Sequence, residues 1–194
     1  MEYDEIKLTL FEPTMKFPDP DLVMFWKTLE TRDIWLDTEV TWENCAFIVQ
    51  YIQYLNAHEA DDLTPIKLHI MSNGGELTTM FAVYHAIKNS KIPVHTINEG
   101  ACHSAAFIIF LAGAKRSMNP DALFVAHEGS GGAAGTFRES KAAMKQYELE
   151  VERMAALIAS ETKLTIEEIN HNYDMNADWY IRHDDAVKYG ILKD

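Results

Sequence analysis

The residues with the most distinctive chemistry in this chain gather around Ser104. Residues 100–106 carry a glycine and then this serine, and they lead into the apolar run 107–113. We therefore expect Ser104 between a glycine-bearing turn and a buried helix, where unpaired backbone N–H groups and the helix dipole favour negative charge. A serine in that place is suited to nucleophilic attack on a carbonyl carbon. A serine that only caps the helix gives the same pattern.

A nucleophilic serine needs a base, and His127 is the leading candidate among the eight histidines. A hydroxyl attacks at neutral pH when a base accepts its proton, and that base is usually a histidine oriented by a carboxylate. His127 ends the strand-like run 121–126 and precedes a glycine-rich segment, so we expect it at the edge of a cleft. A histidine that only caps a strand end is the alternative. His103 directly precedes Ser104, and adjacent side chains at a helix start diverge, so we expect no pairing between them.

Gly74 and Gly75 supply a second element of such a site. The pair follows the strand-like run 66–71 and precedes a segment, 77–87, with the apolar spacing of a helix. Glycine lets backbone N–H groups approach a substrate carbonyl, so the pair is suited to an oxyanion hole. A phosphate site, a thioester site or a turn without chemistry would have the same pattern.

In this order, the segments resemble a known family, the proteolytic subunit of the Clp protease, a self-compartmentalising serine peptidase. The resemblance covers the chain from about residue 22 onward, and four segments carry it: 71–75, 100–106, 124–129 and 178–190. Four motifs in the family's order make chance similarity improbable.

The resemblance implies a complete set of catalytic groups. It places the nucleophile on Ser104, the base on His127 and the acid that orients the base on Asp178. It implies an oxyanion hole formed by the backbone N–H groups of Gly74 and Ala105. It implies no metal and no organic cofactor.

Three other aspartates lie close to Asp178 in the sequence, namely Asp174, Asp184 and Asp185. Asp178 precedes the apolar triplet 179–181, which would anchor it. Asp184 and Asp185 stand where a helix is expected to begin, and carboxylates there commonly interact with the helix dipole. These observations favour Asp178 as the acid.

The chain departs from the family pattern beside the candidate site. Asn73 and Gly129 stand where the family has prolines, and Cys102 and His103 stand where it has two small residues. Proline fixes φ and stiffens a turn, so we expect the glycine loop and the segment after His127 to be less rigid here.

The alternation of strand-like and helix-like segments predicts an α/β fold. The resemblance implies the ClpP/crotonase-like fold of repeated ββα units with a long protruding handle helix. Residues 1–194 are expected to form a single peptidase domain, with a divergent N-terminal segment at 1–21 and a handle strand and helix at 131–162. The apolar stripe from residue 136 to 162 predicts a helix roughly 35–40 Å long.

Further patterns predict shorter elements. A strand is expected at 34–36 and an amphipathic helix at 41–56. Residues 92–97 have the β-branched content of a strand that ends before the glycine-bearing turn. A capping box at Thr165 and Glu168 predicts the start of another helix.

Composition limits the classes of function. The net charge of −13 argues against a nucleic-acid partner, which needs clustered basic residues. The longest apolar run is too short to cross a bilayer, and the acidic N-terminus differs from a signal peptide. Two cysteines provide no disulfide framework, so a cytoplasmic location is expected.

The expected function is therefore serine-type cleavage of unfolded proteins or peptides inside an oligomeric ring chamber. The resemblance implies heptameric rings of this chain stacked as a tetradecamer, with an AAA+ unfoldase as a further partner. Three alternatives stay open: a weak or inactive ring subunit, a crotonase-fold acyl-CoA enzyme, and a divergent peptidase without an ATP-driven partner. An ordered serine, histidine and aspartate favour a peptidase over acyl-CoA chemistry.

Overall fold

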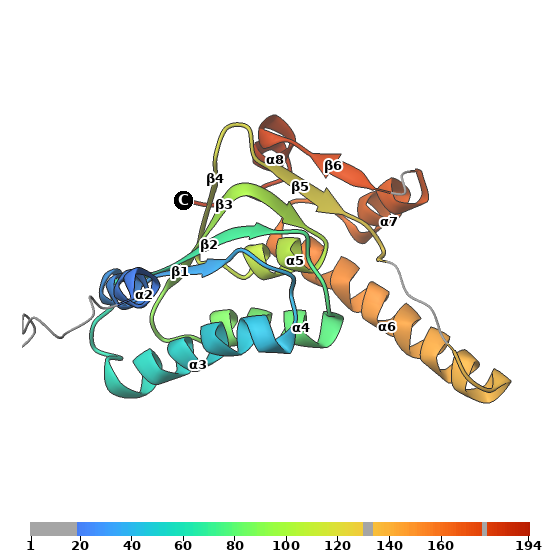
Figure 1. Cartoon of the computed structure of the whole chain (residues 1–194). Helices are drawn as coiled ribbons and strands as arrows, with labels where there is room; N and C mark the ends of the chain where they lie inside the picture. The colour runs from blue at the N-terminus through green and yellow to red at the C-terminus, as the bar shows by residue number, and fades with distance from the viewer. Residues whose placement is uncertain (1–18, 130–133, 176–177) are drawn as a thin grey trace, which may run out of the picture. The chain divides into compact units, whose positions relative to one another are not determined.

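The computed structural model describes residues 19–129, 134–175 and 178–194 (Figure 1). The chain divides into two compact units, residues 1–32 and 33–194. The expected N-terminal segment at 1–21 falls almost entirely outside the described residues, and so does most of the expected handle strand at 131–135.

The first unit contains helix α2, Pro20–Thr31. Asp19 caps it by accepting a hydrogen bond from the Asp21 N–H at 2.9 Å, and Pro20 occupies the first turn, where no backbone donor is needed. Arg32 ends the helix with a left-handed backbone conformation, φ 56°.

The second unit is built on one sheet (Figure 1). Its strands, in spatial order, are β1 Asp33–Leu36, β2 Ile66–Ser72, β3 Val94–His103, β5 Leu123–Ala126 and β6 Trp179–Ile181, and β4 Lys115–Met118 pairs with β3. All pairs are parallel except β5 with β6. The prediction of an α/β fold is confirmed.

Three helices pack together below the sheet in Figure 1: α3 Trp42–His58, α4 Leu77–Lys88 and α5 Ala105–Leu111. Every residue of α5 is buried, which explains its unbroken apolar sequence. Two shorter helices, α7 Ile166–Met175 and α8 His183–Lys188, flank β6 in sequence. The capping box predicted for α7 is present, since the Thr165 and Glu168 side chains each accept the other's backbone N–H.

The prediction of a turn at Gly100 is wrong. Strand β3 continues through it to His103 because residues 101–103 pair with β5 and Cys102 pairs with Ser72 of β2. The register with β2 shifts just before this point, and the Asn98 side chain accepts the Gly100 N–H at 3.1 Å. Pairing on both sides therefore keeps the segment extended up to the residue before Ser104.

The long helix is present as α6, Phe137–Glu161. Thr136 and Glu139 form a reciprocal capping box at its start. Its buried residues, Met154, Ala155 and Ile158, lie in its second half, and its first half extends beyond the sheet (Figure 1).

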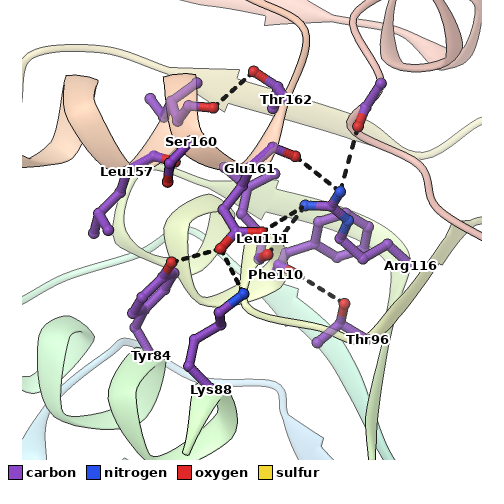
Figure 2. Close-up of polar contacts among 12 residues, drawn as sticks. Tyr84, Lys88, Thr96, Phe110, Leu111, Arg116, Leu157, Ser160, Glu161 and Thr162 are labelled. Atoms are coloured by element: carbon purple, nitrogen blue, oxygen red, sulfur yellow. Dashed lines mark hydrogen bonds and ion pairs between the residues drawn. The ribbon is translucent and has the colours of Figure 1, made fainter.

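A buried arginine holds the C-terminal end of α6 (Figure 2). Arg116 of β4 is 5% exposed, and its guanidinium donates to the carbonyls of Leu111, Glu161 and Gly190 at 3.1, 2.9 and 3.4 Å. One side chain thus connects the ends of α5 and α6 with the turn after α8. These carbonyls would otherwise be unpaired helix-end acceptors.

The Glu161 carboxylate completes this network (Figure 2). It accepts from the Tyr84 hydroxyl at 2.8 Å and the Lys88 ammonium at 2.6 Å, both on α4, and lies 3.8 Å from Arg116. Burial and this carboxylate raise the pKa of Tyr84, so its hydroxyl stays protonated and donates.

We expect Arg116→Met to lower the free energy of unfolding by about 3 kcal/mol, because it leaves buried carbonyls unpaired and Glu161 without one cation. Urea unfolding followed by circular dichroism measures this change. The matched control is Lys115→Met, an exposed neighbour on β4, which should change stability by less than about 0.5 kcal/mol. Equal effects of the two substitutions would contradict a structural role for Arg116.

Candidate active site

Ser104 stands between β3 and α5 in an unusual backbone conformation, with φ 53° and ψ −123°. Apart from Arg32, it is the one non-glycine residue with positive φ among residues 19–129, 134–175 and 178–194. Its N–H donates to the Val125 carbonyl of β5 at 2.7 Å, which holds the serine against the sheet. Strained residues of this kind persist where the surroundings fix them, and they concentrate at functional sites.

The loop containing Gly74 packs directly on Ser104. A Cβ at Gly74 would lie 2.7 Å from the His103 carbonyl oxygen, 2.8 Å from the Ser104 Cβ and 3.0 Å from the Ala105 nitrogen. The φ of Gly74 is +94°, a second reason why glycine is required. Val40 clamps the loop, since its N–H donates to the Gly74 carbonyl at 2.8 Å and its carbonyl accepts the Glu76 N–H at 2.7 Å.

The backbone N–H groups of this region differ in their partners. The Gly74 N–H donates to the Ser72 hydroxyl oxygen at 3.2 Å, and that hydroxyl donates to the Thr38 carbonyl. Neither Gly75 nor Ala105 has an acceptor for its N–H within the part of the chain that the structure describes. Two unpaired donors therefore flank the Gly74–Ser104 contact.

Ser104, His127, Gly74 and Gly75 line one cavity of about 560 Å³. The remaining lining residues come from the loop after β1, the end of β2, the start of α4, the segment after His127 and helix α6: Asp37, Thr38, Glu39, Met71, Ser72, Asn73, Leu77, Gly129 and Tyr147. The structure thus brings the sequence-predicted serine, histidine and glycines together from three separate segments.

Strand pairing brings His127 and Asp178 together. Ala126 of β5 pairs with Trp179 of β6 in antiparallel register, so the residues that follow and precede this pair are neighbours. The His127 Nδ1 lies 3.8 Å from the Asp178 Oδ1, beyond hydrogen-bond distance. The Tyr180 hydroxyl donates to the other carboxylate oxygen at 3.5 Å. No hydrogen bond joins Ser104 to His127 in the described residues, so the three groups are gathered but not tightly aligned.

His103 lies near these groups without lining the cavity. Its Nε2 is buried and has no hydrogen-bond partner among the described residues. Burial lowers the pKa of His103 and the nearby His127 lowers it further, while Asp178 opposes both. His103 is therefore a neutral imidazole at neutral pH. Its proximity to the histidine and aspartate, both distant in sequence, could not be seen in the sequence.

The other aspartates have different positions. Asp184 and Asp185 lie in the first turn of α8, as the sequence predicted. Asp174 of α7 lines an adjoining cavity of about 620 Å³, together with Glu128 and Glu152, and this cavity shares Gly129 and Tyr147 with the first. Asp178 is thus the aspartate whose carboxylate lies next to His127.

Sequence reasoning missed two groups of cavity residues. Asp37, Thr38 and Glu39 follow β1, and only the pairing of β1 with β2 brings them beside the glycine loop. Tyr147 appeared in the sequence only as one member of the apolar stripe of α6. Its hydroxyl was the available signal, because a tyrosine on an apolar helix face often directs its hydroxyl to a hydrogen-bond partner.

Comparison with known families gives an extensive match. Residues 21–194 match the family model described as Clp protease. The chain belongs to the Clp protease family. The match begins where the resemblance was expected to begin, and it includes every residue of the cavity and Asp178.

Curated relatives agree with this assignment. The chain is 31% identical over 183 residues to the ATP-dependent Clp protease proteolytic subunit 2 of Treponema denticola, covering 93% of this chain and 89% of the relative. It is 28% identical over 172 residues to the subunit of the same name from Treponema pallidum, covering 88% and 84%. The proteolytic subunit from Dehalococcoides mccartyi is 27% identical over 166 residues, covering 84% and 81%.

These matches support a Clp-type peptidase and do not favour an acyl-CoA enzyme. Among the described residues, no helix combines the length and apolar character that a membrane crossing requires.

Gly74→Ala should lower the free energy of unfolding by about 2 kcal/mol, because the new Cβ meets the backbone of residues 103–105 and forces a positive-φ alanine. Urea unfolding measures the loss. Gly100→Ala is the control, since the nearest atom to its Cβ is the Met71 Cε at 3.9 Å. If Gly74→Ala were as stable as Gly100→Ala, the close contact between the glycine loop and Ser104 would be disproved.

Proposed function

We propose that this chain is a serine-type endopeptidase whose nucleophile is Ser104. The observation that carries the proposal is the positive-φ backbone of Ser104 at the start of buried α5, beside two backbone N–H groups without acceptors. Ser104 lines the cavity, and the N–H groups are available for a developing oxyanion.

In the proposed reaction, the Ser104 Oγ attacks the carbonyl carbon of a peptide bond while His127 accepts the hydroxyl proton. The tetrahedral intermediate collapses, the C–N bond breaks, and His127 returns the proton to the leaving amine. Water then attacks the acyl-enzyme with His127 again as the base, which releases the acid and restores Ser104. Asp178 orients His127 and stabilises its charged form. These steps use only protein side chains, backbone donors and water.

For the oxyanion hole we propose the Ala105 N–H together with a donor from the glycine loop. The resemblance gave that second donor as Gly74, but the Gly74 N–H already donates to the Ser72 hydroxyl oxygen. The N–H of Gly75 has no such partner among the described residues, so we assign the second donor to Gly75. Gly74 then contributes through its lack of a side chain, which allows the loop to approach Ser104.

The 3.8 Å separation of His127 and Asp178 is compatible with this mechanism. Catalytic hydrogen bonds are often long in the absence of substrate and shorten in the reacting complex. We expect the histidine to move toward both Asp178 and Ser104 when substrate binds or when subunits assemble.

We further propose that the chain forms heptameric rings that stack as a tetradecamer, receive unfolded polypeptide and cooperate with an AAA+ unfoldase in the cytoplasm. The names of the relatives describe ATP-dependent proteases. Helix α6 exposes Phe137, Met144 and Leu149, apolar side chains suited to burial between two rings. Both cysteines, Cys45 and Cys102, are free and buried, which suits a reducing compartment.

We expect a fluorophosphonate to form a single adduct on Ser104, because an activated serine attacks phosphorus as it attacks a carbonyl carbon. Intact mass and peptide mapping locate the adduct, which should be absent from Ser104→Ala. Peptide turnover should fall by several orders of magnitude in that variant. The absence of an adduct in a folded, assembled sample would contradict the proposal and favour an inactive ring subunit.

Matched variants test the base and the acid in the same assay. His127→Ala should abolish labelling, whereas His103→Ala should retain most of it, because His103 does not line the cavity. Asp178→Ala should slow labelling more than Asp174→Ala, because Asp174 does not line the cavity that contains Ser104 and His127. The reverse order within either pair would show that the base or the acid is wrongly assigned.

Assembly is tested by analytical ultracentrifugation. We expect the unaltered chain to sediment as a tetradecamer, and Phe137→Glu combined with Leu149→Glu to give single heptameric rings, because two charges would enter the contact between rings. The control, Lys145→Gln, changes an exposed polar residue of the same helix and should leave the tetradecamer intact. Sedimentation of the unaltered chain as a monomer would refute the assembly.

A further inference from the structure

A side chain of helix α6, Tyr147, is hydrogen-bonded to the segment that carries His127. The Tyr147 hydroxyl donates to the carbonyl of Glu128, the residue directly after His127, at 3.0 Å. Tyr147 lies between the exposed start of α6 and its buried residues Met154, Ala155 and Ile158. Helix α6, which is held at its C-terminal end by Arg116, thus contacts the backbone directly after His127.

Gly129 makes this contact sterically possible. A Cβ at Gly129 would overlap the Tyr147 hydroxyl, and the φ of Gly129 is +98°, a conformation that other residues rarely adopt. Gly129 is one of the positions where the pattern of the Clp protease family has a proline and this chain does not. The tyrosine and the glycine therefore fit each other, and the hydrogen bond restrains a segment that has no proline to stiffen it.

The chemistry of the tyrosine suits a lasting hydrogen bond. Burial and the carboxylates of Glu128 and Glu150 raise the pKa of Tyr147, so the hydroxyl keeps its proton and remains a donor. Tyr147 and Gly129 also line the same cavity as Ser104 and His127. The contact is consequently part of the cavity wall beside the reacting groups.

No hydrogen bond holds the His127 ring against the other two proposed catalytic groups in the part of the chain that the structure describes. Its ring has no hydrogen bond to Ser104 among the described residues, and its Nδ1 is 3.8 Å from Asp178. Small displacements of the backbone at residue 128 therefore change its distance to both groups. Productive alignment tolerates errors of only a fraction of an ångström.

We propose that Tyr147 is a positioning residue that fixes the backbone after His127 and so aligns this histidine with Ser104 and Asp178. The inference rests on the proposed function, because it assumes that His127 is the base. It assigns a role to helix α6 inside the active site, through a tyrosine and a glycine that fit each other.

The test compares Tyr147→Phe with the unaltered chain on an unstructured fluorogenic peptide. The phenyl ring still lines the cavity, so we expect KM to change by less than about twofold while kcat falls about tenfold, the loss of one hydrogen bond. Tyr54→Phe on α3, an exposed tyrosine outside the cavity, is the control and should leave both constants unchanged. An unchanged kcat in Tyr147→Phe, or a change in KM alone, overturns the proposal.

A double variant tests whether the two residues act as a pair. Gly129→Ala alone should reduce kcat more than Tyr147→Phe, since the new methyl group displaces the hydroxyl and the segment after His127. Gly129→Ala combined with Tyr147→Phe should be no worse than Gly129→Ala alone, because the clash is removed. If the fall in kcat of the double variant equalled the product of the falls in the two single variants, a shared contact would be contradicted.

Amide hydrogen exchange separates a failure of this inference from a failure of the proposed function. If the unaltered chain neither turns over peptide nor labels at Ser104, the proposed function fails, and exchange in residues 123–129 still tests the contact. Faster exchange there in Tyr147→Phe, but not in Tyr54→Phe, supports the restraint on the backbone after His127. Equal exchange in both variants overturns it.

Discussion

The candidate site depends on the close approach of two backbone segments, the glycine loop after β2 and the junction of β3 with α5. Gly74 lies so close to residues 103–105 that no side chain fits between them. Ser104 is held from the other side by its hydrogen bond to Val125. Val40 clamps the loop through the Gly74 carbonyl and the Glu76 N–H, so hydrogen bonds provide the rigidity that a proline at position 73 would otherwise supply. Backbone packing therefore sets the distance between the serine and the unpaired N–H groups.

The proposed base and acid are held less firmly. His127 and Asp178 flank one antiparallel residue pair at the ends of β5 and β6, and the Asp178 side chain is 47% exposed. Their carboxylate and imidazole are neighbours without a hydrogen bond. One side of the site is thus fixed by packing, and the other can be adjusted by contacts such as that of Tyr147 with Glu128. This arrangement, with a firmly held serine and a less firmly held histidine and aspartate, is what we expect of a peptidase whose three catalytic groups align only on substrate binding or assembly.

Helix α6 connects this adjustable side to the rest of the unit. Arg116 and Glu161 hold the C-terminal end of α6 through hydrogen bonds and ion pairs (Figure 2), whereas the first half of the helix has no buried residue. Between these two regions, Tyr147 contacts the segment after His127. Contacts made by the exposed half of α6 could therefore act on the proposed base, His127, through the hydrogen bond between Tyr147 and Glu128. The proposed ring contacts would act on the exposed half.

Local sequence patterns predicted the elements with strong periodicity or capping signals, including α6, α7 and the strand before Gly74, because these depend on neighbouring residues. The sequence also identified Ser104, His127 and Asp178 as candidates, since their motifs are local and in a recognisable order. The extension of β3 through Gly100, the pairing of the Gly74 N–H with Ser72 and the contact between Tyr147 and Glu128 were decided by tertiary structure. Hydrogen bonds and steric exclusion between segments distant in the chain produce these features, and periodicity within one segment carries no information about them.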